Sequence, residues 1–236
     1  FSDGALPAIT NDVWVDPANG MDESNIIGDE ENPFLTIGYA LSVILSTEEN
    51  SITINLVEGT YSPSINNESF PIIFNSNISL IGQENYFTII DAEETGGVIS
   101  IQYCNNVSLS NLTITGGNSI ENWSTNYGGG ISIYNSNPNL SQLIVTNNTA
   151  NIGGGIWLFE ANPTIEHILI GNNIAVEDGG GIYLSSSNPI INHTSISNNV
   201  AGDQGGGIRS ILSSMPEFTN VEISNNLADY GGGLSS

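Results

Sequence analysis

The sequence is almost free of basic residues. Arg209 is its one lysine or arginine, against 25 aspartates and glutamates, so the formal net charge is −24. Such a chain repels phosphate groups, which argues against nucleic acid and anionic membrane surfaces as partners and favours cations. Cys104 is the one cysteine, so no disulfide can form within the chain. No apolar run reaches the roughly 18 residues of a membrane span, so we expect no direct membrane insertion.

Glycine is abundant instead, and much of it is arranged in five triplets. The triplets recur at intervals of 25, 26, 26 and 26 residues and end at Gly130, Gly155, Gly181, Gly207 and Gly233. A proline recurs in step with them, at Pro138, Pro163, Pro189 and Pro216. Counting from each proline, position +10 is always asparagine and position +12 is always alanine. This alignment identifies the chain as a repeat protein.

Each repeat contains short apolar segments with period-two alternation, which is typical of strands rather than helices. A unit of this size cannot bury its own apolar face, so it must stack on its neighbours. We therefore predict an all-β chain, a right-handed parallel β-helix with about 25–26 residues per coil and coils about 4.8 Å apart. The glycines suit corners that need positive φ or leave no room for a Cβ, and the recurring asparagines suit a ladder between coils.

The segment 33–46 departs from the strand pattern. Phe34, Ile37, Leu41 and Ile44 recur with a helical period, and Pro33 suits a first helical turn. An open β-helix end exposes unpaired strand edges, so we expect this α-helix to cap the N-terminal end. The prediction is one structural domain with a cap region at residues 1–50 and coils at 51–236, and we expect further coils after Ser236.

Three segments near the N-terminus carry a family resemblance. They are Val15-Asp-Pro-Ala-Asn-Gly-Met-Asp, Asn32-Pro-Phe-Leu-Thr-Ile-Gly-Tyr-Ala-Leu and Ile54-Asn-Leu-Val-Glu-Gly-Thr-Tyr. They resemble the N-terminal region of secreted pectate-lyase-like β-helix proteins, many of them uncharacterised bacterial proteins. The later Asn…Ala…Gly-Gly-Gly-Ile repeats resemble those of polymorphic outer-membrane adhesins. Over residues 13–236 the resemblance implies a β-helix fold and an extracellular location, secreted or attached to a cell surface, and it implies little about activity.

Aromatic residues gather in the strands that follow the glycine triplets. Alternation directs four of them outward on three adjacent coils, with Arg209 beside them: Tyr134, Trp157, Phe159 and Tyr183. An exposed aromatic cluster indicates a surface that stacks sugar rings or binds a partner protein. The alternative is that loops, a neighbouring domain or a second chain covers the cluster.

Acidic residues stand two positions before the last three triplets, at Glu177, Asp203 and Asp229. Coils in register would place these carboxylates about 5 Å apart, where they repel one another unless water or a cation separates them. A second acidic loop, at 16–31, includes Asp16 and Asp22. Because calcium accepts carboxylate, amide and backbone oxygens, we predict calcium at these five residues. A solvated acidic surface is the alternative.

Catalysis has less support in the sequence. A lyase of acidic polysaccharides needs a base and cationic groups, and only Arg209 could serve. A glycoside hydrolase needs paired carboxylates, and the coils show no obvious pair, so we name no catalytic residue. His167 and His193 share one position on adjacent coils and could bind a metal, but a column of polar corner residues with Gln142 and Asn220 also accounts for them.

These patterns favour an extracellular β-helix module with a structural, adhesive or carbohydrate-binding role. The expected partner is a polysaccharide or other glycan, or another protein surface. Two alternatives stay open at this point: a polysaccharide-acting enzyme, either lyase or glycoside hydrolase, and a filament or assembly subunit that associates with itself through the aromatic face.

Overall fold

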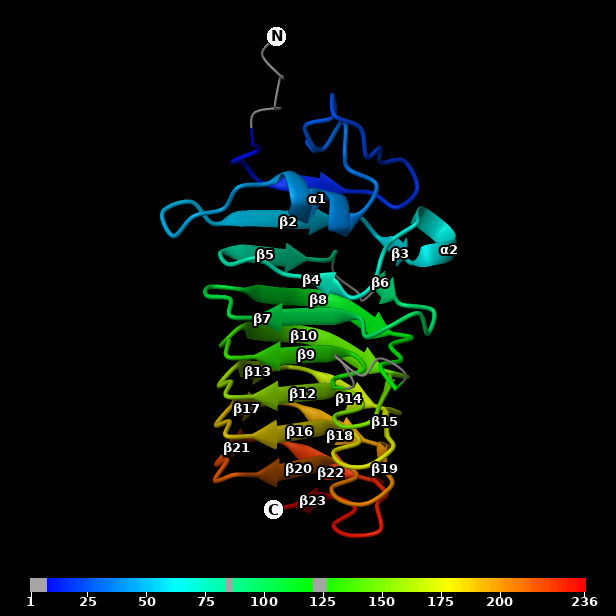
Figure 1. Cartoon of the computed structure of the whole chain (residues 1–236), viewed down its shortest axis with the longest axis vertical. Coiled ribbons are helices and arrows are strands. Elements are labelled where there is room, and N and C mark those ends of the chain that lie inside the picture. The colour runs from blue at the N-terminus through cyan, green and yellow to red at the C-terminus, as the bar shows by residue number, and fades with distance from the viewer. Residues whose placement is uncertain (1–7, 84–86, 121–126) are drawn as a thin grey trace.

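The computed structural model describes residues 8–83, 87–120 and 127–236. In this part of the chain, short strands wind into a solenoid whose coils stack along one long axis (Figure 1). The strands pair in parallel and build three sheets of 13, seven and three strands. The predicted all-β parallel β-helix is confirmed.

The seven-stranded sheet takes one short strand from each coil. Its members are β4 (Ile72–Ile73), β7 (Ile99–Gln102), β9 (Ile131–Tyr134), β12 (Ile156–Phe159), β16 (Ile182–Ser185), β20 (Ile208–Ile211) and β23 (Leu234–Ser235). The three-stranded sheet contains β11 (Thr149–Ala150), β15 (Ile174–Ala175) and β19 (Val200–Ala201).

The thirteen-stranded sheet forms the other long face of the solenoid. Its N-terminal members are β1 (Val13–Val15), β2 (Ile52–Leu56), β3 (Gly59–Tyr61), β5 (Ile78–Ile81), β6 (Thr88–Asp91) and β8 (Ser108–Thr115). Its later members are β10 (Asn139–Thr146), β13 (Thr164–Glu166), β14 (Leu169–Gly171), β17 (Ile190–Asn192), β18 (Ser195–Ser197), β21 (Glu217–Thr219) and β22 (Glu222–Ser224).

The core lies between the sheets and consists of stacked columns of aliphatic side chains. In the seven-stranded sheet, Ile156 pairs in register with Ile131 and Ile182, and all three are fully buried. Because side chains alternate along each strand, every second residue enters such a column while its neighbours face outward. The core columns therefore fix which side chains remain available for binding.

The glycine triplets form a corner just before the seven-stranded sheet. Gly153 has a φ of 69°, a conformation that suits glycine. A Cβ on Gly154 would lie 2.5 Å from the carbonyl oxygen of Ile174, and one on Gly155 would lie 2.6 Å from that of Gly181. The first glycine therefore supplies the turn, and the other two make room for the adjacent coil.

The recurring asparagines form the predicted ladder. The backbone N–H and the side-chain amide of Asn148 both donate to Oδ1 of Asn173, each at 3.1 Å. Asn173 donates in the same way to Asn199, and Asn199 to Asn226. Asn148, Asn173 and Asn199 are fully buried, so the ladder satisfies polar groups inside the solenoid and ties each coil to the next.

The N-terminal helix is shorter than the predicted segment 33–46. Helix α1 covers Ile37–Val43, after Thr36, whose side chain accepts a hydrogen bond from the N–H of Tyr39. The segment before it is extended because the backbone of Phe34 bonds with Trp14 and Asp16, alongside β1. On the other side, Ile44 is extended and bridges to Ile9. Strand pairing at both ends therefore shortens the helix, which contacts β1 and β4 at the N-terminal end of the solenoid (Figure 1).

Two carboxylates fix the helices of this region. Glu68 is buried and accepts hydrogen bonds from the N–H groups of Ile37 and Gly38 at the start of α1. These bonds lower the pKa of Glu68, but burial has the larger effect and the pKa is raised above its ordinary value. Glu93 accepts hydrogen bonds from Ser64 and Ser62 at the start of α2 (Pro63–Asn66). The bonds from Ser64 and then Ser62 lower the pKa of Glu93.

No helix in the described residues has the length and apolar character of a bilayer-spanning segment.

Candidate functional site

The outer face of the seven-stranded sheet carries the predicted aromatic residues. Trp157 and Phe159 of β12 alternate with the buried Ile156 and Leu158, so both rings lie on the outside. In register, Trp157 has Ser132 and Tyr183 as neighbours, and Phe159 has Tyr134 and Ser185. The structure thus brings Tyr134, Trp157, Phe159 and Tyr183 onto one face, as the alternation predicted.

The rings on this face contact one another. The centroids of Trp157 and Phe159 are 5.7 Å apart with an interplanar angle of 22°. Phe159 also lies 5.5 Å from Tyr134, at 44°. The cluster is therefore a continuous apolar surface rather than a set of isolated exposed rings.

Two further tyrosines belong to the cluster and were absent from the predicted set. Tyr127 stacks on Trp157 with centroids 4.9 Å apart at 12°. Tyr103 meets Tyr134 edge to face at 4.9 Å and 87°, and this neighbouring hydroxyl raises the pKa of Tyr134. Tyr127 bridges to Ile152, the residue before the next glycine triplet, so counting back from the triplet would have found it.

Tyr183 differs from the expectation of an exposed ring, because only 9% of it is exposed. It lies in register between Trp157 and Arg209, which flank it on the two adjacent strands. Burial raises the pKa of the Tyr183 phenol, and the nearby Asp178 acts in the same direction. Nε of Arg209 lies 3.9 Å from a carboxylate oxygen of Asp178, so the one basic side chain stands beside the cluster with a partner of its own.

Small residues in the outward rows leave hollows beside the rings. Ser100 and Ser132 continue the row of Trp157 toward the N-terminus, and a hollow of about 250 Å³ lies over them, lined also by Gln102, Tyr127 and Trp157. A second hollow, of about 400 Å³, lies on the other side of Trp157, and its lining includes Phe159, Tyr183 and Ser185. We call the two hollows and the six clustered rings the aromatic groove; five of the rings line the hollows, and Tyr103 joins them through its contact with Tyr134. The six rings are Tyr103, Tyr127, Tyr134, Trp157, Phe159 and Tyr183. Among the described residues that line the hollows, none is acidic or basic.

In the acidic loop, the carboxylates predicted to bind calcium accept hydrogen bonds from nearby residues of the chain. Oδ1 of Asp16 accepts the backbone N–H groups of Ala18 and Asn19, and Oδ2 accepts the side-chain amide of Asn19. Burial tends to raise the pKa of Asp16, but these bonds outweigh it and the pKa lies below its ordinary value. Asp22 accepts hydrogen bonds from Leu35 and Thr36. Both carboxylates thus hold the loop in place, and calcium at them stays a prediction.

The other predicted calcium ligands lie on successive coils without converging. The backbone N–H of Asp203 donates to the carbonyl oxygen of Glu177 at 2.8 Å, and the next coil continues with Asp229. Within the part of the chain that the structure describes, one group of three acidic, histidine or cysteine side chains has all its ligand atoms within 4.8 Å of one another, and it consists of Glu166, His167 and His193. Glu177, Asp203 and Asp229 do not form such a group, and calcium there also stays a prediction.

Comparison with known proteins places the chain in a family. The family model described as "Protein of unknown function (DUF1565)" matches residues 18–228. The chain belongs to this family. The match confirms the β-helix family expected from the sequence; the extracellular location stays a prediction. No curated protein matches the chain.

Two solved structures resemble this DUF1565 protein at a distance. One is the pectin methylesterase from Aspergillus niger in deglycosylated form, with 12% identity over 98% of this chain and 91% of that chain, and a TM-score of 0.45. The other is ORF18 of Geobacillus virus E2, with 12% identity over 92% of this chain and 62% of that chain, and a TM-score of 0.37. The DUF1565 match itself spans both the aromatic groove and the cluster of Glu166, His167 and His193.

Proposed function

We propose that the protein binds carbohydrate in the aromatic groove. The observation that carries this proposal is the near-parallel arrangement of Tyr127, Trp157 and Phe159 beside hollows lined by serines and Gln102. Flat rings suit the apolar faces of sugar rings, and a few hydroxyl and amide groups suit sugar hydroxyls. Binding sites commonly combine a mostly apolar lining with a few polar groups in this way.

The charge of the chain favours neutral sugars. With a net charge of −24, the protein repels uronates and other anionic sugars unless cations intervene. No basic side chain lines either hollow among the described residues, so the groove offers no partner for a sugar carboxylate. The proposed ligand class is therefore a neutral oligo- or polysaccharide.

The lining of the groove favours binding over hydrolysis. Glycoside hydrolysis takes two carboxylates that flank the scissile bond. The described residues of both hollows supply serine, glutamine and tyrosine side chains but no carboxylate. A stiff solenoid that presents such a groove suits a structural or adhesive module, and we propose that the protein has this role outside the cell.

The test is a glycan array followed by calorimetric titration of a neutral oligosaccharide. Trp157→Ala should raise the Kd at least about tenfold, equivalent to about 1.4 kcal/mol, because it removes the central ring. Trp157→Phe keeps a flat ring and should restore much of the affinity. Phe87→Ala removes an exposed ring elsewhere on the solenoid and should leave the Kd unchanged.

Three outcomes would contradict the proposal. They are the absence of any neutral glycan among the array hits, a Kd that Trp157→Ala does not change, and a dimer that Trp157→Ala converts to a monomer. Sedimentation of both proteins distinguishes the last case, because a self-association surface would lose its partner on the same substitution. Circular dichroism confirms that each variant is folded.

A further inference from the structure

Two histidines occupy the same corner of adjacent coils. His167 lies between β13 and β14, and His193 lies between β17 and β18. Both have positive φ, 54° and 47°, as do Gln142 and Asn220 at the equivalent corners of the flanking coils. The backbone of this corner therefore adopts one conformation in all four coils, and the side chain that it carries is free to differ.

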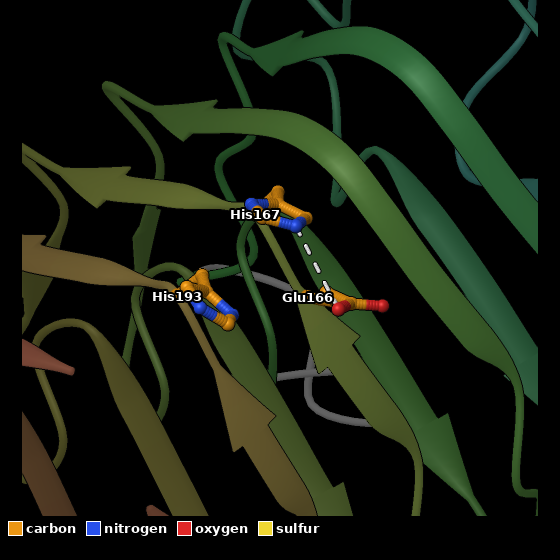
Figure 2. Close-up of side chains that lie close together, drawn as sticks. All are labelled: Glu166, His167 and His193. Carbon is orange, nitrogen blue, oxygen red and sulfur yellow. Dashed lines mark ion pairs between the residues drawn. The ribbon is translucent and has the colours of Figure 1, made fainter. Parts of the chain in front are cut away.

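The corner positions three possible metal ligands together. The rings of His167 and His193 stack with centroids 4.9 Å apart at an angle of 21°. Nε2 of His167 lies 3.6 Å from a carboxylate oxygen of Glu166, the last residue of β13. Figure 2 shows the three side chains grouped at the ends of neighbouring strands, and their ligand atoms all lie within 4.8 Å of one another.

We propose that Glu166, His167 and His193 form a binding site for one Zn²⁺ ion. Neutral imidazole nitrogen and carboxylate oxygen are the donors that zinc accepts, at about 2.0–2.2 Å. Tetrahedral coordination at that bond length needs donor atoms about 3.3 Å apart, so the side chains must close in by small rotations. The side chains of His167 and Glu166 are 55% and 44% exposed, so they can rotate without repacking the core.

The surroundings favour an ion at this place. The acidic chain attracts cations, and its one arginine lies in β20 of another sheet, where it cannot neutralise Glu166. Nδ2 of Asn220 lies 2.8 Å from Nε2 of His193 and donates to it. Zinc would therefore bind His193 either at Nε2, in place of this hydrogen bond, or at Nδ1 once the Asn220 amide turns its oxygen toward an Nε2–H, the arrangement usual for a metal-bound histidine. Both histidines border an open hollow of about 420 Å³, so solvent can complete the coordination.

The coils themselves supply conservative variants for the test. His167→Gln installs the residue of the preceding coil, Gln142, and His193→Asn installs that of the following coil, Asn220. Both replacements are compatible with the corner, because the same backbone conformation already carries them. Glu166→Gln removes the carboxylate, and Glu160→Gln removes a carboxylate from a different corner as the matched control.

Calorimetric titration with ZnCl₂ should give one site per chain for the wild type and for Glu160→Gln. Each histidine variant and Glu166→Gln should weaken binding at least tenfold, and the double histidine variant should abolish the site. Cobalt(II) bound to the wild type should give a visible absorption band that the double variant lacks, and calcium in excess should not displace zinc. Unchanged zinc stoichiometry in the double variant, or loss of the site in Glu160→Gln, would overturn the proposal.

Discussion

Replacing one rung of the buried asparagine ladder should destabilise the protein strongly. Asn173→Ala leaves the backbone N–H of Asn148 without the Oδ1 atom that accepts it, and an unpaired buried donor costs about 1–3 kcal/mol. It also removes three side-chain hydrogen bonds, two to the neighbouring asparagines of the ladder and one to the carbonyl of Val145, each contributing about 1 kcal/mol. The expected loss of unfolding free energy is about 4–6 kcal/mol.

The assay is equilibrium urea denaturation followed by far-ultraviolet circular dichroism and tryptophan fluorescence. Asn172→Gly is the control, because the adjacent Asn172 is exposed and has a φ of 58°, which glycine adopts readily. It should change the unfolding free energy by less than about 0.5 kcal/mol. A loss below about 1 kcal/mol for Asn173→Ala, or equal losses for both variants, would refute the reasoning.

Two further predictions concern the corners and a helix start. Gly154→Ala should lower the unfolding free energy by about 1–3 kcal/mol, because the added Cβ overpacks the corner. Gly96→Ala is the control and should be tolerated, because its Cβ would meet no atom closer than 3.6 Å. Equal urea midpoints for the two variants would contradict this reasoning. Hydrogen bonds from Ser64 and Ser62 hold the folded-state pKa of Glu93 below its ordinary value, so its stabilisation is fully present above the ordinary pKa and is lost as the pH falls through the folded-state pKa. Glu93→Gln should therefore be less stable than the wild type at pH 7, and the difference, followed by urea midpoints, should vanish in acid.

The solenoid was predictable because its determinants are local and repeated. A corner that excludes a Cβ needs glycine in every coil, and a buried ladder needs asparagine at each rung, so both leave identical residues at fixed spacing. The ends of α1 were not predictable in the same way. The apolar period at Phe34 and Ile44 is compatible with a helix, but pairing with β1 and with Ile9 holds both residues extended. Those contacts join segments that show no repeat.

The aromatic groove was predictable only in part. Alternation along β12 sets the direction of Trp157 and Phe159, so the sequence is sufficient for them. The low exposure of Tyr183 depends on its neighbours on the adjacent strands, Trp157 and Arg209, which are identified only once the register is known. Tyr127 stands directly before the first glycine triplet, and its place in the cluster follows only from counting back from that triplet to the position of Ile152 in the next coil. For both Tyr183 and Tyr127, the deciding contact is therefore with a residue of an adjacent coil, Trp157.

The same distinction explains where a solenoid can carry a binding site. Inward side chains must remain aliphatic and corner residues must keep their positive φ, so the stability of the solenoid restricts which residues these positions accept. Outward rows and corner side chains carry no such constraint, and both proposed sites use them: the groove around Trp157 on the seven-stranded sheet, and His167 with His193 at a corner of the larger sheet. In each case contacts between adjacent coils, about one strand spacing apart, bring together groups that lie 25 to 31 residues apart in the sequence. A change of one side chain per coil is therefore enough to create or remove a site while the backbone stays the same.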